Sequence, residues 1–463
     1  MAPAPLEPSD RRRVAVVGSG VAGLTAAHVL ARSPRPHHVT LYEADARLGG
    51  HAHTHDIVVA TPDGDRTVGV DTGFIVHNDR TYPTLTRLFA ELGVETQDSD
   101  MSMSVRDDAA GLEYAGARGL RGLFPAPRNA LTPAYLRMLA EVNGFHRAAQ
   151  RLLATPAIPG DPGETLRSFV DRVGFTPFFV RSFLEPLVAA VWSCDPVVAL
   201  DYPARYLFTF LDHHGMLTVF GSPTWRTVTG GSARYVERVA AGLHEIRRGC
   251  AVVAVTESAD AVTVTDDHGR REAYDAVVLA THPHQALAML TDPSDQRCEV
   301  LGAMTYTPNV AQLHTDESVL PRHAGARASW NYWRRADGDP QGAVLVSYDI
   351  SRLMRLDVPD TRFIVTLGGV DRVDPSTVID TMTYEHPLYT SRSVAAQAQL
   401  PGIRSPRVAF AGAYHGWGFH EDGALSGVDA ARHLGVEWET TVSESHLPGD
   451  RAADVPTPEP VAS

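Results

Sequence analysis

The sequence predicts an α/β protein whose N-terminal part is a Rossmann-like, doubly wound domain that binds a dinucleotide. Residues 14–17 are a short apolar run typical of a strand, the glycine turn GSGVAG follows, and LTAAHVLARS then has helical spacing. Residues 39–44, VTLYEA, predict a second strand that places Glu43 about 20 residues after the turn. A glycine motif alone would be weak evidence, but strand, turn, helix, strand and acid together are specific for a dinucleotide site.

Each part of this unit has a physical role in holding a dinucleotide. Gly18 permits the tight turn, Gly20 lets the backbone approach a pyrophosphate, and Gly23 lets the helix pack on the strand. The helix N-terminus adds free N–H groups and a partial positive charge. Glu43 can accept both ribose hydroxyls of an adenosine and would repel a 2′-phosphate, which argues against NADP. The residues predicted to make these contacts are Gly18, Ser19, Gly20, Val21, Ala22, Gly23, Glu43 and Ala44.

Composition and charge exclude several classes of function. The chain of 463 residues has a formal net charge of −14, which argues against a nucleic-acid partner. It contains no lysine, so all 41 basic residues are arginine and no lysine is available for a Schiff base. The cysteines Cys194, Cys250 and Cys298 form no CxxC pair and fit a reducing compartment and core packing. Because the N-terminus has neither a signal peptide nor a membrane-spanning run, we expect a soluble cytoplasmic protein without a transmembrane segment, and transient contact with a membrane surface stays open.

A second glycine pair after the acid distinguishes this chain from a plain NAD-binding protein. Gly49 and Gly50 follow Arg47 and Leu48, and this spacing resembles the E-x3-R-x-GG signature of the FAD-binding amine oxidase and desaturase superfamily. The resemblance implies that FAD is the cofactor and that the arginine and the glycine-pair backbone hold its pyrophosphate and flavin side. Many members have an arginine after the glycine pair, where this chain has His51.

The segment HAHTH raises the alternative of a metal site. His51, His53 and His55 alternate along the chain, so on a strand they would share one face and could bind a metal. No cysteine or further histidine-rich segment completes a ligand set, and a flavin protein with this loop needs no metal. We therefore predict no metal site.

Further segments match the superfamily, and the resemblance places each of them beside the cofactor. The turn in GVDTGF lies by the isoalloxazine ring in the superfamily. The first strand of a β-meander passes the adenine, and its match here is Val252 or, one residue on, Val253. A final strand runs into Gly412, and GALSG opens a helix near Gly423 that aims its N-terminus at the flavin pyrimidine carbonyl. The matching residues are Thr72, Gly73, Phe74, Val252, Ala280, Thr281, Gly412, Asp422, Gly423, Ala424 and Ser426.

The match goes beyond the superfamily level and runs from about residue 12 to 436. The segments that carry this match include GGHAHTHD, DTGFIVHNDRTYPTLTRLFAELGV, SPTWRTVTGGSARYVERV, ASWNYW and GFHEDG. With them the chain resembles a bacterial family of FAD/NAD-binding proteins that are typically encoded beside cyclopropane-fatty-acyl-phospholipid-synthase-like methyltransferases. The resemblance implies an oxidoreductase of lipid or fatty-acyl modification, with a small apolar or lipid substrate and such a methyltransferase as candidate partner.

The chain is expected to divide into two discontinuous domains. Helical spacing dominates residues 80–225, and strands mixed with loops follow from about 300 to 400. In the superfamily such insertions form a substrate lobe, which implies an α+β substrate domain beside an FAD-binding domain of the glutathione-reductase and amine-oxidase type. The predicted boundaries are 11–78, 226–295 and 405–436 for the FAD-binding domain, 79–225 and 296–404 for the substrate domain, and 1–10 and 439–463 for flexible tails.

Candidates for catalysis come from two segments. HGWGFHEDG, near the C-terminus, contains His415, His420 and Glu421, and a histidine in such a site could act as general base or orient a substrate. Asn309 lies in TPNVAQLHTD, where many amine oxidases of the superfamily place a lysine bridged by water to flavin N5. The absence of lysine weakens an amine oxidase interpretation.

The sequence therefore predicts an FAD-dependent oxidoreductase of the amine oxidase superfamily that oxidises or desaturates a fatty-acyl or other apolar lipid substrate by hydride transfer to flavin N5. Three alternatives stay open: a redox-neutral FAD-dependent isomerase that moves a double bond in a fatty acid, an amine oxidase, and a flavin-loaded partner of a lipid methyltransferase. The apolar residues of the two insertions belong mostly to cores, and a tunnel for an acyl chain cannot be separated from core without a fold.

Overall fold

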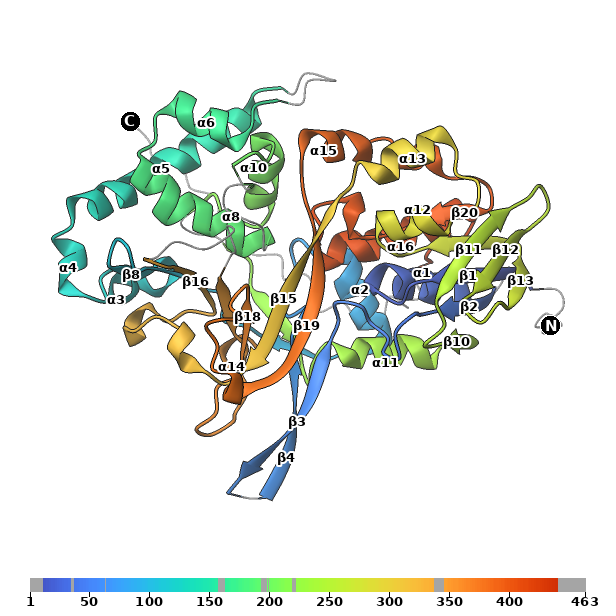
Figure 1. Cartoon of the computed structure of the whole chain (residues 1–463), viewed down its shortest axis with the longest axis horizontal. Helices are drawn as coiled ribbons and strands as arrows, with labels where there is room; N and C mark the ends of the chain where they lie inside the picture. The colour runs from blue at the N-terminus through green and yellow to red at the C-terminus, as the bar shows by residue number, and fades with distance from the viewer. Residues whose placement is uncertain are drawn as a thin grey trace, which may run out of the picture.

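The computed structural model describes residues 11–34, 37–62, 64–156, 163–192, 198, 200–218, 222–336 and 345–439. Within these residues a five-stranded sheet and a seven-stranded sheet form two neighbouring bodies, each with its own helices (Figure 1). The predicted tails lie outside the described residues, apart from Glu439, and so does Cys194. Cys250 is buried, whereas Cys298 is exposed, so the predicted core packing is wrong for Cys298.

The five-stranded sheet is the predicted doubly wound, parallel sheet. Its strand order is β10-β2-β1-β14-β20, and every neighbouring pair is parallel. Because side chains alternate along a strand, Val14 and Val16 enter a core with α1 and α16, while Ala15 and Val17 enter a second core. The β-meander β11-β12-β13 closes that second core together with α12 and α13. The predicted fold class is confirmed.

The seven-stranded sheet joins two distant parts of the chain. Its order is β19-β15-β18-β17-β16-β7-β8, and β7 pairs with β16 in parallel, whereas the other pairs are antiparallel. Helices α5, α6, α8 and α10 share one large apolar core with this sheet. The domain boundaries predicted from the sequence stay a prediction.

The bounds of the elements around these cores are as follows. The five parallel strands are β1 (Arg13–Val17), β2 (His38–Tyr42), β10 (Glu245–Arg247), β14 (Ala276–Leu279) and β20 (Val408–Phe410). The meander is β11 (Val252–Glu257), β12 (Val262–Asp266) and β13 (Arg271–Tyr274). The seven-stranded sheet consists of β7 (Met103–Asp107), β8 (Leu112–Ala115), β15 (Tyr306–His314), β16 (Trp330–Arg334), β17 (Val346–Asp349), β18 (Ile364–Leu367) and β19 (Val378–Pro387). The helices used below are α1 (Val21–Ala31), α2 (Pro83–Leu92), α3 (Gly119–Leu123), α4 (Pro127–Ala130), α5 (Pro133–Ala154), α6 (Leu166–Val173), α8 (Glu185–Trp192), α10 (Ala204–His213), α12 (Pro283–Met289), α13 (Asp295–Gly302), α15 (Ser391–Gln397) and α16 (His420–His433).

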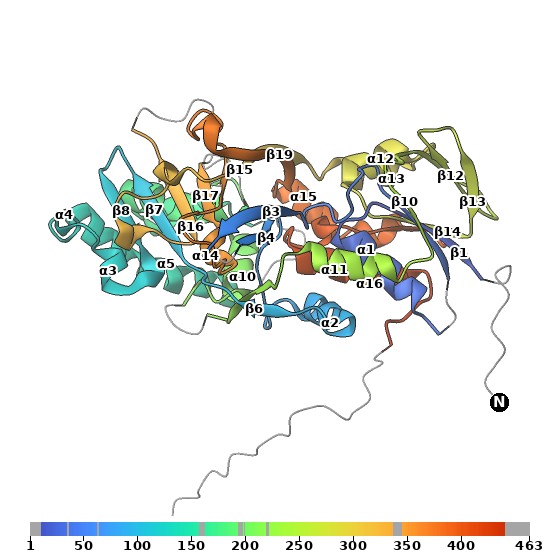
Figure 2. The same cartoon turned by 90° about the horizontal axis from the view of Figure 1, so that it is seen from below.

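A projecting hairpin and the positions of the meander and the helices define the shape of the molecule. The hairpin of β3 (Thr54–Thr61) and β4 (Gly64–Asp71) projects from the body of the molecule. Figure 2 shows the meander at one end of the molecule and helices α3, α4 and α5 at the other.

The last helix, α16, begins at His420 and not near Gly423 as predicted. The side chain of Asp422 accepts the Phe419 N–H at 2.9 Å and so caps an earlier turn. No helix within the described ranges combines the length and the apolar character needed to cross a bilayer.

Candidate active site

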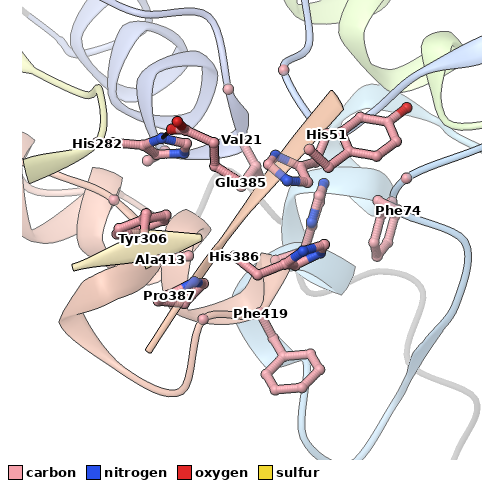
Figure 3. Close-up of a pocket in the computed structure, with 18 of the residues that line it drawn as sticks. Val21, His51, Phe74, His282, Tyr306, Glu385, His386, Pro387, Ala413 and Phe419 are labelled. Atoms are coloured by element: carbon pink, nitrogen blue, oxygen red, sulfur yellow. Dashed lines mark hydrogen bonds and ion pairs between the residues drawn. The ribbon is translucent and has the colours of Figure 1, made fainter. Parts of the chain in front are cut away.

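A cavity of about 1000 Å³ lies where the carboxyl ends of the parallel strands face the seven-stranded sheet. Gly18 follows β1, Glu43 follows β2, Ala280 follows β14 and Gly412 lies just past β20, and all four line the cavity. Ligands of open α/β sheets bind outside the carboxyl ends of the strands, so this is the expected position of a dinucleotide. Figure 3 shows side chains from several elements converging on the cavity.

The glycines of the first turn are required for three different reasons. Gly18 has φ +98°, and a Cβ there would lie 2.7 Å from the carbonyl oxygen of Ala280. A Cβ on Gly23 would lie 1.9 Å from the Gly18 oxygen, so only glycine allows α1 to pack this close to β1. A Cβ on Gly20 would meet nothing within 4 Å, and Gly20 lines the cavity. A side chain at Gly20 would therefore enter the space of a ligand without disturbing the protein.

The carboxylate of Glu43 is held in place at the cavity wall. Its Oε2 accepts the backbone N–H of Ser19 at 2.9 Å and the Ser19 hydroxyl, and its Oε1 accepts the Asp45 N–H at 2.9 Å. Each oxygen keeps further lone-pair capacity for a ribose hydroxyl.

The second glycine pair completes a cradle around the first turn. A Cβ on Gly50 would lie 3.2 Å from Cα of Gly20, and the Gly49 N–H donates to the Ser19 oxygen at 3.1 Å. Arg47 lines the cavity and donates to the carbonyl oxygens of Leu48 and Ala52, which orients its guanidinium. These close backbone approaches, one placed arginine and the first turn of α1 fit the pyrophosphate of FAD.

The predicted cofactor residues divide into those that line the cavity and those that support it. The lining group comprises Gly18, Ser19, Gly20, Val21, Ala22, Glu43, Ala44, Arg47, Gly50, His51, Thr72, Gly73, Phe74, Val252, Ala280, Thr281 and Gly412. Gly23, Leu48, Gly49, Asp422, Gly423, Ala424 and Ser426 are not brought to its surface. The hydroxyl oxygen of Ser426, for example, accepts the Gly412 N–H at 2.8 Å and so holds the loop after β20 from the side away from the cavity.

Only one of the four predicted catalytic residues reaches the cavity. His420 lines it, with its ring stacked on Phe74 at 3.7 Å, and burial lowers the pKa of His420 to about 3. His415 is off the lining, and burial lowers its pKa to about 3 as well. Glu421 caps another helix: its two carboxylate oxygens accept the N–H groups of Thr84 and Leu85, both at 2.9 Å. Neither His415 nor Glu421 is brought to a reacting position.

Asn309 lies just behind the cavity lining and forms a hydrogen bond with His386, a residue that the sequence did not indicate. Its side-chain nitrogen lies 2.9 Å from Nδ1 of His386, which is partly buried in the cavity wall and whose pKa is lowered to about 4 by desolvation. Because an amide nitrogen can only donate, Nδ1 of His386 accepts and the ring hydrogen is on Nε2. The short segment TYEHP contained this histidine, but nothing local in the sequence placed it opposite Asn309.

A second pair that the sequence analysis missed lies beside the first. Nδ1 of His282 donates to Oε2 of Glu385 at 2.6 Å, and the His282 ring stacks on Tyr306 at 4.3 Å (Figure 3). Burial lowers the pKa of His282, and Glu385 opposes this shift. His51 completes the histidine group at 6.4 Å from His282 between ring centroids, and burial holds its pKa well below the ordinary value.

The alternating histidines after the second glycine pair bind separate partners, although the ring centroids of His53 and His55 lie 4.2 Å apart. His53 bonds to the Tyr384 hydroxyl at 3.0 Å, and His55 bonds to Asp380 at 2.8 Å. The ligand atoms of His282, His284 and Glu385 lie within 4.8 Å of one another, a spacing that a metal could use. Within this group His282 bonds directly to Oε2 of Glu385 at 2.6 Å, and Nε2 of His284 lies 3.8 Å from the same oxygen, so these contacts hold the group together by themselves.

The other end of the cavity is apolar. Its walls come from α8, α10 and the strands β16, β17 and β18, and its polar group His214 has a pKa that burial lowers to about 4. Four of the described lining residues are charged, and none belongs to the elements that supply these walls: Glu43, Asp45 and Arg47 follow β2, and Glu385 lies on β19. The apolar lining consists of Ile75, Val76, Met101, Ala190, Val191, Trp192, Phe210, Met216, Trp225, Trp330, Tyr348, Val365, Leu367, Trp417 and Phe419.

Comparisons with known proteins agree with this geometry. A family model described as flavin-containing amine oxidoreductase matches residues 21–435. The flavin-dependent L-tryptophan oxidase RebO of Lentzea aerocolonigenes is 25% identical over 367 residues, which cover 73% of this chain and 74% of that protein. Cyclohexylamine oxidase from Brevibacterium oxydans has a TM-score of 0.64 at 16% identity, over 92% of this chain and 98% of its own. A CLA-producing fatty acid isomerase from P. acnes has a TM-score of 0.65 at 16% identity, over 92% and 99%. At these identities the two structures establish the fold alone.

Proposed function

We propose a function from one premise: the chain belongs to the family of flavin-containing amine oxidoreductases and is an FAD-dependent oxidoreductase. Within this family, we propose that it oxidises an uncharged, apolar substrate such as a fatty-acyl chain and introduces a double bond. A small lipid substrate, a methyltransferase partner and a cytoplasmic location belong to the same proposal.

The apolar end of the cavity is the observation that carries this proposal. Its walls hold aliphatic and aromatic side chains, and no described lining residue there is charged. Each methylene of an acyl chain buried against such walls gains about 0.8 kcal/mol. A substrate ammonium group would lose its hydration there without a carboxylate to replace it. The chain also contains no lysine to take the role that lysine has in many amine oxidases of the superfamily.

Two cavity histidines, each paired with a polar side chain, have opposite roles: one can accept a proton and the other can donate a hydrogen bond. Glu385 accepts the hydrogen on Nδ1 of His282, which leaves Nε2 of that ring with a lone pair as proton acceptor. Asn309 donates to Nδ1 of His386, which leaves Nε2–H of that ring as a donor. We therefore assign His282 as general base and His386 as the group that orients or polarises a polar head of the substrate.

The reaction assigned to this site removes two hydrogens from neighbouring carbons. FAD, when bound, would accept one hydrogen as a hydride, which carries both electrons of the oxidation. The proton from the adjacent carbon goes to Nε2 of His282, and the apolar walls exclude water while it moves. Gly18, Gly20, Arg47, Gly50 and Glu43 would hold the cofactor in place.

A redox-neutral double-bond isomerase is the second candidate, and the paired histidines favour it. A proton acceptor and a donor in one cavity can remove hydrogen at one carbon and return it at another. Such an isomerisation would use the same apolar end of the cavity to bind the substrate, and it requires no external electron acceptor.

Anaerobic mixing of the yellow holoprotein with unsaturated fatty acids, and separately with primary amines, tests the proposal. Bleaching of the flavin by the lipid and not by the amines supports oxidation. Conversion of the lipid to an isomer of the same mass, with no oxygen uptake when the mixing is repeated in air, supports the second candidate. Bleaching by amines alone, with peroxide release in air, would overturn both.

A further inference from the structure

An exposed surface at the end of the molecule away from the meander combines leucines with arginines. It is formed by α3, α4 and the first turn of α5, which lie together at that end in both views (Figures 1 and 2). We propose that this surface docks the protein onto a membrane that contains anionic phospholipid. We call it the arginine–leucine face, and it consists of Leu120, Arg121, Arg128, Leu131 and Leu136.

The apolar part of the face is unusually exposed. Leu131 is 82% exposed and Leu120 is 75% exposed, more than any other large apolar side chain among the described residues. Leu136, in the first turn of α5, is 43% exposed. The other side of α3 and of the first turn of α5 faces inward, since Leu123 and Tyr135 pack against the core of the seven-stranded sheet. These helices are therefore amphipathic, as expected of a segment that lies in the plane of a membrane surface.

The charge of the face is opposite to that of the whole chain. The protein has a net charge of −14, yet residues 114–140 contain four arginines and no aspartate or glutamate. Within the part of the chain that the structure describes, neither Arg121 nor Arg128 has an ion-pair partner, so both charges are available. An anionic lipid surface is complementary to this local charge, and each basic residue near it contributes about 1 kcal/mol.

A hollow lined by Arg121, the residue after Leu120, offers a place for a lipid head group. It has a volume of about 390 Å³ and is lined by Asp100, Arg118, Arg121 and Gly325. Asp100 pairs with Arg118 at 3.8 Å and with Arg352 at 3.6 Å, which leaves the guanidinium of Arg121 for a phosphate.

The face also adjoins the apolar end of the cavity. Arg118, in the turn before α3, is paired with Asp100, and the next residue, Met101, lines the cavity. Docking through this face would bring the acyl chains of a bilayer to the apolar side of the site. This link rests on the proposed function, whereas the docking itself does not.

A second copy of the chain fits the same face less well. A two-fold interface would bring Arg121 and Arg128 of one copy against the same patch of the other, with no acid in residues 114–140 to compensate. The partner that the charge and the exposed leucines both suit is a lipid surface.

Vesicle flotation of the FAD-loaded full chain tests the proposal. Wild-type protein should float with vesicles of phosphatidylcholine and phosphatidylglycerol and stay behind with pure phosphatidylcholine. Arg121→Glu with Arg128→Glu should weaken binding at least about tenfold, and Leu120→Gln with Leu131→Gln should lower it further at high salt. Val58→Gln, 64% exposed on the projecting hairpin, and Arg392→Glu on α15 are matched controls that should float like wild type.

Three results would overturn the proposal: no flotation of wild type with anionic vesicles, equal flotation of the double arginine variant, or equal loss in the controls. If the face variants instead turn a dimer into a monomer while vesicle binding is unchanged, a second copy covers the face and the proposal is wrong. Flavin absorbance and thermal melting confirm that each variant is folded. Flotation does not require turnover, so failure of the proposed reaction would leave this result unaffected.

Discussion

The side-chain nitrogen of Asn309 on β15 lies 2.9 Å from Nδ1 of His386 on β19, although the two residues are 77 positions apart. This one bond determines which nitrogen of a cavity histidine carries the hydrogen.

Replacing His386 tests the role assigned to it. We expect His386→Gln to lower the rate constant of substrate-dependent flavin reduction by about 10² to 10³-fold, the usual range for loss of one hydrogen-bond donor that polarises a substrate. Asn309→Asp should approach this loss, because a carboxylate accepts from Nδ1–H and leaves Nε2 without its hydrogen. Stopped-flow absorbance measures both, with His415→Gln as a buried histidine control off the cavity. A wild-type rate in His386→Gln would contradict the assignment.

We predict different effects of substitution at Gly20 and Gly23, two glycines of the first glycine turn. Gly20→Val should fold normally and lose FAD, since its side chain enters open space in the cavity. Gly23→Ala should damage folding itself, because its Cβ would lie 1.9 Å from the Gly18 oxygen. Thermal melting and the flavin-to-protein absorbance ratio separate the two effects. Gly302→Val, on α13 with open space around it, is the control, and a yellow Gly20→Val protein would show that the phosphate turn is misplaced.

Glu421 is expected to act in stability rather than in catalysis. Its carboxylate accepts the N–H groups of Thr84 and Leu85 at the start of α2. Glu421→Ala should lower the free energy of unfolding by about 1 to 3 kcal/mol, and Glu421→Gln should lose less because one oxygen remains. Denaturant unfolding measures the loss, and the turnover of folded variant should match wild type. A large fall in turnover at unchanged stability would restore the catalytic role.

Because several histidines are buried, we expect the free energy of unfolding to fall in mild acid. Burial lowers the pKa of His77, His214 and His314 to about 4, whereas each has its ordinary value near 6.5 when unfolded. The unfolded chain therefore binds more protons in this window, and the stabilisation present above pH 6.5 is lost as pH falls towards 4. Each such histidine contributes up to about 1.4 kcal/mol per pH unit.

Urea unfolding between pH 5 and 8 measures this slope. His314→Gln, remote from the cavity, should reduce the slope by the contribution of one proton. The exposed His268→Gln is the matched control and should leave it unchanged. A stability that does not change between pH 8 and pH 5 would be inconsistent with the neutral buried rings.

The function is expected to be independent of metal. Dialysis against a chelator should leave FAD content and turnover unchanged, as should His284→Ala. Elemental analysis showing one zinc per chain, lost in His284→Ala, would instead assign a metal to His282, His284 and Glu385.

The nucleotide half of the site was predictable because its constraints are local. The turn from Gly18 to Gly23 and the acid at Glu43 belong to one strand–helix–strand unit, where backbone geometry dictates glycine at fixed spacings. The alternation of β1 between two cores was likewise present in four consecutive apolar residues.

The reacting half depended on contacts between distant segments. His282 meets Glu385 across 103 positions, and Glu421 reaches α2 across 337 and 336 positions. Strand register and helix packing decide such contacts, and no local pattern encodes them. The sequence by itself thus determined that the chain binds FAD on a parallel sheet. Only the tertiary structure decided that His282 and His386 enter the cavity while His415 and Glu421 support it, because side chains meet only once the two sheets face each other.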